Sequence, residues 1–296
     1  MRPHPFAALL MAALLALCAG SALAGNPRAA LRAVESSMQL QGWIHLTAEG
    51  RVEQVELDSA GLVPEGVAGF VRSTAQRWRF APVHDADGAA VPVRAPLSLR
   101  VIARKLAKDQ FELSLGSVAF SRYDQDDPSS LAVLRNQPPR YPRELIRPGV
   151  GGDTYMAVKV GRDGQVEDIA TRQVNLNVAG SAKKMERWRQ QLAAASAAAI
   201  RAWAFRVPTE GPEADAPYWI ALVPVGYRVS GPAPASAEVQ EGPAWNNYVR
   251  GPLEPLPWID PSDARNALRP DSLADGGAYL LPRGGGLQPL TPLEER

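Results

Sequence analysis

Few side chains in this sequence could carry out chemistry, and their spacing does not form a reaction centre. His45 lies on a predicted strand and His84 in a loop, so both are expected at the surface. The acidic run Asp124, Asp126 and Asp127 lacks the spaced ligands and closing glutamate of a calcium loop. The sequence also lacks a nucleophile elbow, a zinc-protease helix motif and a phosphate loop. We predict that the protein is not an enzyme and holds no metal or cofactor.

The first 24 residues have the pattern of a secretory signal peptide. Arg2 is followed by an uncharged apolar run over 6–18, which is shorter than the roughly 20 residues that span a bilayer. Ala22 and Ala24 are small residues at the spacing that signal peptidase reads, which predicts cleavage before Gly25. We therefore expect a periplasmic protein. The alternative is a retained N-terminus that anchors the protein in the inner membrane, facing the periplasm.

Cysteine usage and charge limit the functions that the exported chain could have. Cleavage would remove Cys18, the single cysteine, and with it any disulfide or thiolate chemistry. The first 24 residues hold one of the 32 basic residues and no acidic one, so the remainder carries 31 of each sign. This balance argues against a nucleic acid as partner.

An order of apolar strand, tight turn, return strand and helix ending in Trp-x-Phe occurs twice along the chain. In the first copy the turn lies at Gly50, and the helix ends at Trp78-Arg79-Phe80. In the second copy Asp163-Gly164 forms the turn, which is a strong hairpin signal, and the helix ends at Trp203-Ala204-Phe205. The repeat predicts two modules with the same element order.

The second copy resembles the C-terminal domain of the TonB energy transducers. That family opens with Pro-x-Tyr-Pro and has a glycine before its first strand, an Asp-Gly hairpin, a helix ending Trp-x-Phe and a following proline. The first copy resembles it less, because it lacks the Tyr-Pro opening. The matching residues here are Pro139, Tyr141, Pro142, Gly152, Asp163, Gly164, Trp203, Phe205 and Pro208.

The resemblance implies both a fold and a mode of binding. The implied fold is α+β, with two small antiparallel sheets each packed by helices, which also agrees with the strand alternation and amphipathic helices. The implied function is capture of a peptide or partner protein, such as an outer-membrane receptor, by addition of a strand to a sheet edge. The predicted docking edge is the last strand of the second copy, with residues Ile220, Leu222, Val223, Val225 and Tyr227.

Two other functions remain open. A retained N-terminal anchor would fit a TonB-type energy transducer for outer-membrane transport, and a scaffold of the cell envelope would need no transport role. Pattern and composition divide the chain into a signal peptide (1–24), a degenerate TonB-like module (25–105), a linker (106–137), a clearer TonB-like module (138–230) and a mostly disordered Pro/Gly-rich tail (231–296). The sequence does not indicate the oligomeric state.

Overall fold

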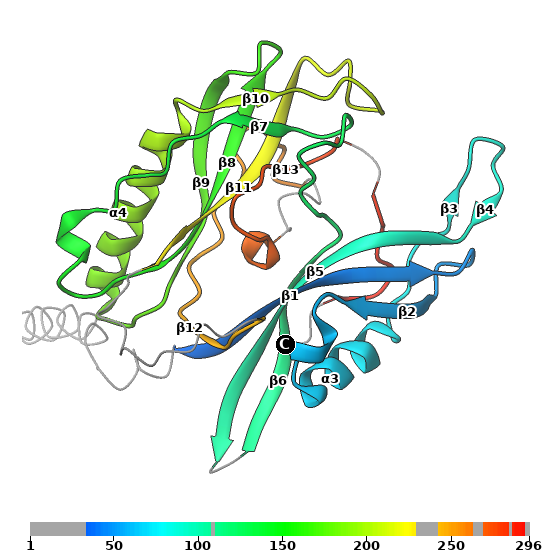
Figure 1. The fold of residues 1–296 in the computed structure, drawn as a ribbon, viewed down its shortest axis with the longest axis horizontal. Coiled ribbons are helices and arrows are strands. Elements are labelled where there is room, and N and C mark those ends of the chain that lie inside the picture. The colour runs from blue at the N-terminus through cyan, green and yellow to red at the C-terminus, as the bar shows by residue number, and fades with distance from the viewer. Residues whose placement is uncertain (1–33, 108–109, 229–241, 263–268, 284–285, 294–296) are drawn as a thin grey trace, which may run out of the picture.

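The computed structural model describes residues 34–107, 110–228, 242–262, 269–283 and 286–293. It is mostly β, with 40% of it in strands and 17% helical. Figure 1 shows two large antiparallel sheets, one above the other, with orange C-terminal segments between them. Helix α4 lies on the outer side of the upper sheet, and α3 lies beneath the lower one.

The first sheet is built around two long neighbouring strands. Its path is β12-β1-β5-β6, and β2 pairs with the other half of β1. The strands are β1 (Glu35–Leu46), β2 (Val52–Leu57), β5 (Val93–Ala107), β6 (Gln110–Ala119) and β12 (Asn246–Tyr248). The strands β3 (Val83–His84) and β4 (Ala90–Val91) form a separate small hairpin.

Buried and less buried residues alternate along the strands of the first sheet, and the buried side chains form its core. From Met38 to Leu46 every second residue of β1 is buried, as a half-buried strand requires. These side chains meet the apolar face of α3 (Glu65–Ala75), which follows a short 3-10 turn, η1 (Ala60–Leu62). The core includes Met38, Leu40, Ile44, Val67, Val71, Trp78, Phe80, Leu97, Leu99, Val101 and Leu115.

The second sheet has the order β13-β11-β8-β9. Its strands are β8 (Gly152–Gly161), β9 (Val166–Leu176), β11 (Tyr218–Tyr227) and β13 (Tyr279–Leu280), and a two-stranded sheet is formed by β7 (Ala132–Arg135) and β10 (Ala204–Arg206). The short turns η2 (Arg143–Leu145) and η4 (Pro270–Ser272) lie in the connections. Helix α4 (Ala182–Ile200) begins after Ser181, whose side chain accepts the Lys184 N–H.

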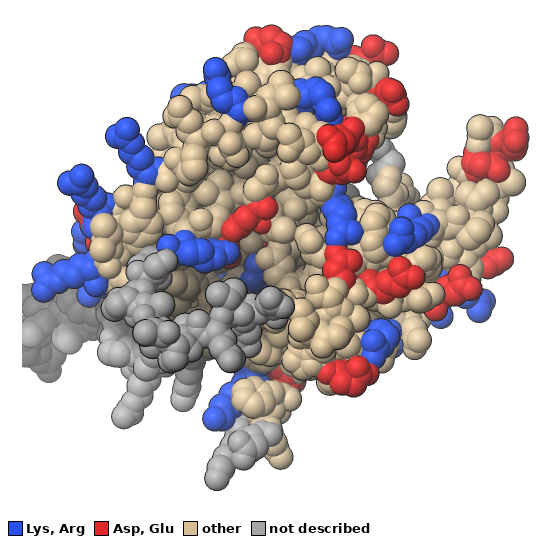
Figure 2. All heavy atoms as spheres, viewed as in Figure 1, with Lys and Arg blue, Asp and Glu red and all other residues tan. Residues whose placement is uncertain are grey.

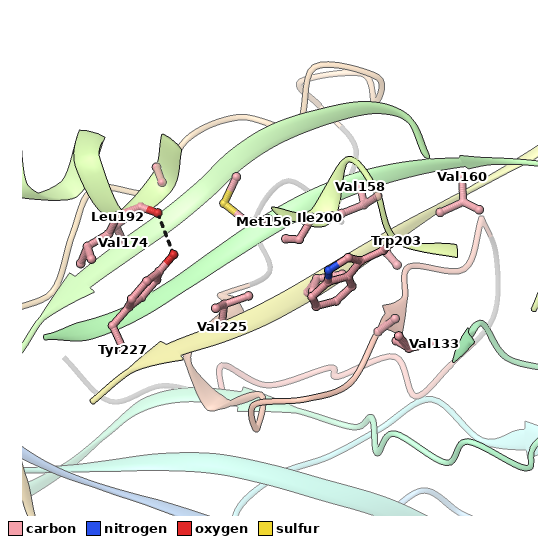
Figure 3. Close-up of a cluster of buried hydrophobic side chains, with 14 of the residues drawn as sticks. Val133, Met156, Val158, Val160, Val174, Leu192, Ile200, Trp203, Val225 and Tyr227 are labelled. Carbon is pink, nitrogen blue, oxygen red and sulfur yellow. Dashed lines mark hydrogen bonds between the residues drawn. The ribbon is translucent and has the colours of Figure 1, made fainter. Parts of the chain in front are cut away.

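The core of the second sheet lies between its strands and α4. Figure 3 shows Trp203, Val225 and Tyr227 among the apolar side chains of this core. The Tyr227 hydroxyl donates to Leu192 O of α4 at 3.2 Å, which satisfies its buried polar group.

Both large sheets contain the same contact between a turn and the segment after the helix. The Phe80 N–H donates to Gly50 O at 2.9 Å, and the Phe205 N–H donates to Gly164 O at 2.9 Å. Both glycines have φ near +75°, in the region that favours glycine. A Cβ on either would lie 2.0–2.1 Å from the phenylalanine carbonyl oxygen, so this packing leaves no space for a side chain.

The predicted α+β fold class is wrong. The described residues form four antiparallel sheets and only two α-helices, so strands dominate and each large sheet packs a single helix rather than several. The difference comes from segments in which no strand was expected. All of β6 lies in the predicted linker, where Phe111, Leu113 and Leu115 alternate with polar residues. The predicted disordered tail supplies β12, η4 and β13.

The parts of the tail that the structure describes are held by aromatic and polar anchors rather than by a periodic pattern. Tyr248 and Tyr279 are buried, and Asp271 is fully buried. Residues 288–290 bond to the backbone of Arg79 and Ala81 in the first sheet's module. The predicted cleavage site at Ala22, Ala24 and Gly25 lies outside the described residues.

Candidate partner-binding edges

The predicted docking strand, β11, is not a free edge. It pairs with β8 over its whole length and with β13 through Ala221 and Leu222. The Leu281 N–H donates to Ile220 O at 2.8 Å and extends this pairing. Continued in the same register, the tail also brings Asp275 against Gly226, where an added Cβ would meet the carboxylate at 2.0 Å. The protein's own residues 275–281 therefore cover the edge.

The side chains of the predicted docking residues are also buried. Val223, Val225 and Tyr227 belong to the core beneath α4, while Ile220 and Leu222 pack on the other face against residues of the tail. Pro224 lies at the covered edge, where its missing N–H removes no bond to β8. The prediction of a docking edge on β11 is therefore corrected, because segments that lack a strand pattern cover it.

The residues of the family motif have structural contacts in this protein. The Tyr141 hydroxyl donates to Val150 O at 2.6 Å, and its ring packs 6.1 Å from that of Tyr227. Trp203 Nε1 donates to Gln137 O at 3.1 Å. Asp163 accepts the Gln165 N–H at the turn. Of the other motif residues, Pro142 lies directly before η2 and Gly152 is the first residue of β8. Pro208 is buried and Pro139 is half-buried.

The candidate chemical residues are not brought together. His45 on β1 lies 3.3 Å from Glu56, and His84 is exposed on β3. Asp124 and Asp127 accept backbone N–H groups two residues ahead, as in turns. Within the described ranges, no group of three or more His, Cys, Asp or Glu residues could hold a metal ion.

A buried polar cluster joins the two sheets, and the sequence did not indicate it. Arg100 of β5 donates to Asp271 O at 2.5 Å, to Ser37 Oγ at 2.8 Å and to the Tyr155 hydroxyl of β8 at 3.3 Å. The Tyr248 hydroxyl of β12 donates to the Asp271 carboxylate. Only tertiary structure brings these distant residues together, so no local pattern could have revealed them.

The pKa shifts in this cluster fix its charges. Burial alone would lower the pKa of Arg100, but Tyr155, Asp271 and Asp153 outweigh burial and raise it. Burial, followed by the nearby Asp271 carboxylate, raises the pKa of Tyr248. Burial also raises the pKa of Tyr155. The guanidinium therefore stays charged and the phenols stay neutral, which suits a structural junction between the sheets.

Strand β6 has an outer edge on which no described residue pairs over residues 110–115, and we call this segment the open edge. The Asp58 N–H donates to Gln41 O. The backbone N–H and C=O groups of odd-numbered residues in β1 therefore point toward β2, and those of even-numbered residues point toward β5. Carrying this alternation through the registers of β5 and β6 gives the backbone groups that point outward. They belong to Phe111, Leu113 and Leu115.

The open edge differs in its charge from the edges formed by β2 and β9. Strand β2 carries two acidic residues among its six, and so do the first six residues of β9, 166–171. Such charges discourage pairing with another chain. The open edge carries only Glu112. Figure 1 shows that the end of the β5–β6 hairpin extends away from the rest of the molecule. Phe111, near this end, is 59% exposed.

Comparison with known proteins does not identify the chain, since no family model, curated protein or solved structure matches it. In the residues that the structure describes, no helix has the length and apolar character needed to cross a membrane. On the face that Figure 2 shows, acidic and basic side chains are interspersed.

Proposed function

We propose that this protein is a non-enzymatic binding protein of the bacterial envelope, and that it captures an extended segment of a partner protein along the open edge of β6. The observation that carries the proposal is the row of outward backbone groups at Phe111, Leu113 and Leu115. A strand added there would satisfy these groups and extend the first sheet. Affinity would come from main-chain hydrogen bonds, so no catalytic side chain is needed.

A groove beside the open edge supports this mode of binding. It has a volume of about 580 Å³, within the usual size of ligand sites, and residues 112–116 form one side. Arg104 pairs with Glu35 at 3.0 Å in its wall. Arg250 donates to Gly116 O at 3.0 Å, so a side chain of this protein already binds the backbone there. The edge available to a partner therefore ends before Gly116.

The envelope location rests on the signal-peptide pattern of residues 1–24, and the binding mode agrees with the resemblance to TonB C-terminal domains. The strand differs from the one that the resemblance implied, because residues 275–281 cover β11. The partner would therefore pair with β6 of the first sheet, and an extended segment of an outer-membrane receptor is one such partner.

The proposal can be tested with peptides selected from a random display library on the full chain. A selected peptide should bind Phe111→Ala nearly as well as wild type, while Phe111→Pro, which also removes the outward N–H, should bind roughly five- to tenfold more weakly. This corresponds to about 1 kcal/mol for one net hydrogen bond. Titration calorimetry measures both constants.

Two outcomes of this test would contradict the proposal. One is equal affinity of the alanine and proline variants, since backbone pairing at the open edge would then contribute nothing. The other is failure to select any peptide while the free protein is a dimer, which would indicate that a second copy occupies the edge.

A further inference from the structure

The open edge of β6 presents different chemistry on the two faces of the first sheet. Its register with β5 is continuous from the first to the last of its outward residues, so the side chains of Phe111, Leu113 and Leu115 all point to one face. The side chains of Glu112 and Ser114 point to the other face. A strand added at this edge would therefore place its own side chains alternately beside an apolar row and a polar one.

The apolar row belongs to the first core. Met38, Val101 and Leu115 lie opposite one another on three neighbouring strands, and all three are almost fully buried. Leu113 is partly buried against the same core, whereas Phe111 is 59% exposed. Apolar side chains of an added strand would continue this row and remove apolar surface of Phe111 from water.

The groove lies on the other face and is polar. Glu112 lies opposite Arg104 in the register of β5 and β6, and Arg104 donates to Glu35 at 3.0 Å. A Cβ added at Gly116 would lie 2.5 Å from the guanidinium of Arg250, which therefore points to this face as well. An apolar side chain over these charged groups would displace their water without replacing its hydrogen bonds. This face therefore favours polar side chains in an added strand.

The open edge also limits the length of the segment that can bind. Outward backbone groups occur at Phe111, Leu113 and Leu115, while Arg250 already binds Gly116 O. A partner that bonds to all three outward residues must be extended over the same length. Directly opposite residues share a face in parallel and in antiparallel pairs, so the alternation does not depend on the direction of the partner.

From these two faces we infer that the partner segment is an amphipathic strand, with apolar residues opposite Phe111, Leu113 and Leu115 and polar residues between them. The inference rests on the strand addition proposed above and adds the class of sequence that the edge selects. Backbone hydrogen bonds form with almost any sequence, so the alternating side chains provide the specificity. A slip by one residue would turn every side chain to the wrong face, so the same pattern also fixes the register.

The test compares two synthetic peptides of equal composition on the full chain. In one, three valines alternate with two threonines, and in the other the three valines are consecutive and the threonines follow. Both have capped ends and flanking lysines for solubility. Valine and threonine are both β-branched, so the order of the residues is the main difference. The alternating peptide should bind about fivefold more tightly by titration calorimetry, because the other order turns a valine toward the polar face.

Two variants show whether the apolar row causes this difference. Phe111→Thr combined with Leu113→Thr removes the exposed part of the row but keeps residues that favour strands, so the two peptides should differ by less than about twofold. Leu134→Thr changes an exposed leucine on β7, away from the open edge, and should keep the difference at about fivefold. A fivefold difference that persists in the double variant would contradict the inference.

The outcomes separate failure of this inference from failure of strand addition itself. If Phe111→Pro binds the alternating peptide as tightly as Phe111→Ala does, the backbone does not pair and both proposals are wrong. If proline weakens binding but the wild type binds the two peptides equally, strand addition holds and the amphipathic partner is overturned. Absence of binding by the alternating peptide would also overturn it, and a dimer joined at β6 would then assign the edge to a second copy.

Discussion

The two large sheets share an element order but differ in how their last strands are covered. The order β2-β1-β5 in the first corresponds to β9-β8-β11 in the second, and both contain the bond between a turn glycine and a phenylalanine. In the first sheet, ten-residue β6 pairs along β5 and leaves a new edge. In the second, β13 and Asp275 cover β11. The position of a strand in its sheet therefore does not decide whether its edge is free. That depends on whether a later segment of the chain covers the strand.

The largest expected effect tests whether the two sheets fold as one unit. Trp78→Ala and Trp203→Ala should each lower the free energy of unfolding by about 3–5 kcal/mol, because both remove a large buried aromatic side chain. Each variant should unfold in a single transition, since the tail bonds to both sheets. Urea denaturation followed by far-UV and tryptophan signals checks this. Two separate transitions would show that the sheets are independent.

A smaller effect is expected from the junction between the sheets. Arg100→Leu removes a buried cation that bonds to Ser37, Tyr155 and Asp271, and should cost about 3 kcal/mol. Arg94→Leu, on the same strand, removes a half-exposed pair with Glu56 and should cost less than about 1 kcal/mol. Chemical denaturation compares the two. Equal losses would mean that the buried cluster does not join the sheets.

The turn that both sheets share should respond equally in each. Gly50→Ala and Gly164→Ala place a Cβ against a carbonyl oxygen at a positive φ, so each should cost more than about 2 kcal/mol. Gly88→Ala has a similar φ but open space around it, so it should cost only about 1 kcal/mol of backbone strain. Thermal unfolding ranks the three variants. A loss at Gly164 but not at Gly50 would show that the two turns are not equivalent.

The smallest effect concerns the segment that covers β11. Burial, followed by the nearby Asp153, raises the pKa of Asp275. A carboxyl with a raised folded-state pKa stabilises the protein below its unfolded pKa, and this contribution is lost as pH rises through the folded value. Asp275→Asn cannot ionise, so its stability relative to wild type should increase between about pH 4 and pH 7. The change should stay under about 1 kcal/mol, because the side chain is 46% exposed and screened. Urea midpoints at both pH values measure it, and a decrease would contradict the assignment.

Local patterns predicted the parts of the fold that depend on neighbouring residues. The hairpin turns at Gly50 and Gly164 and the two helices could be expected from turn residues and from apolar spacings of three and four. The alternation at Phe111, Leu113 and Leu115 was present in the sequence, but the surrounding polar residues made the segment resemble a linker. The tail could not be predicted in this way, because single residues such as Asp271 and Tyr279 hold it in place through contacts with distant strands.

The candidate sites were predicted less well than the elements. Strand addition as a mode of binding was implied by the resemblance to TonB C-terminal domains and is still a proposal. Its position depends on which edge remains uncovered, and that is a tertiary property. The buried cluster around Arg100 was not indicated at all, since its residues lie far apart in the chain.

Single-residue amide exchange in the free protein, measured by NMR, tests the central claim most directly. The account predicts alternating protection in β6, with fast exchange at Phe111, Leu113 and Leu115 and slow exchange at Glu112 and Ser114, whose N–H groups face β5. In β11, Leu222 should exchange slowly because β13 covers it. Uniformly slow exchange in β6, or fast exchange at Leu222, would contradict an open edge on the first sheet and a filled one on the second.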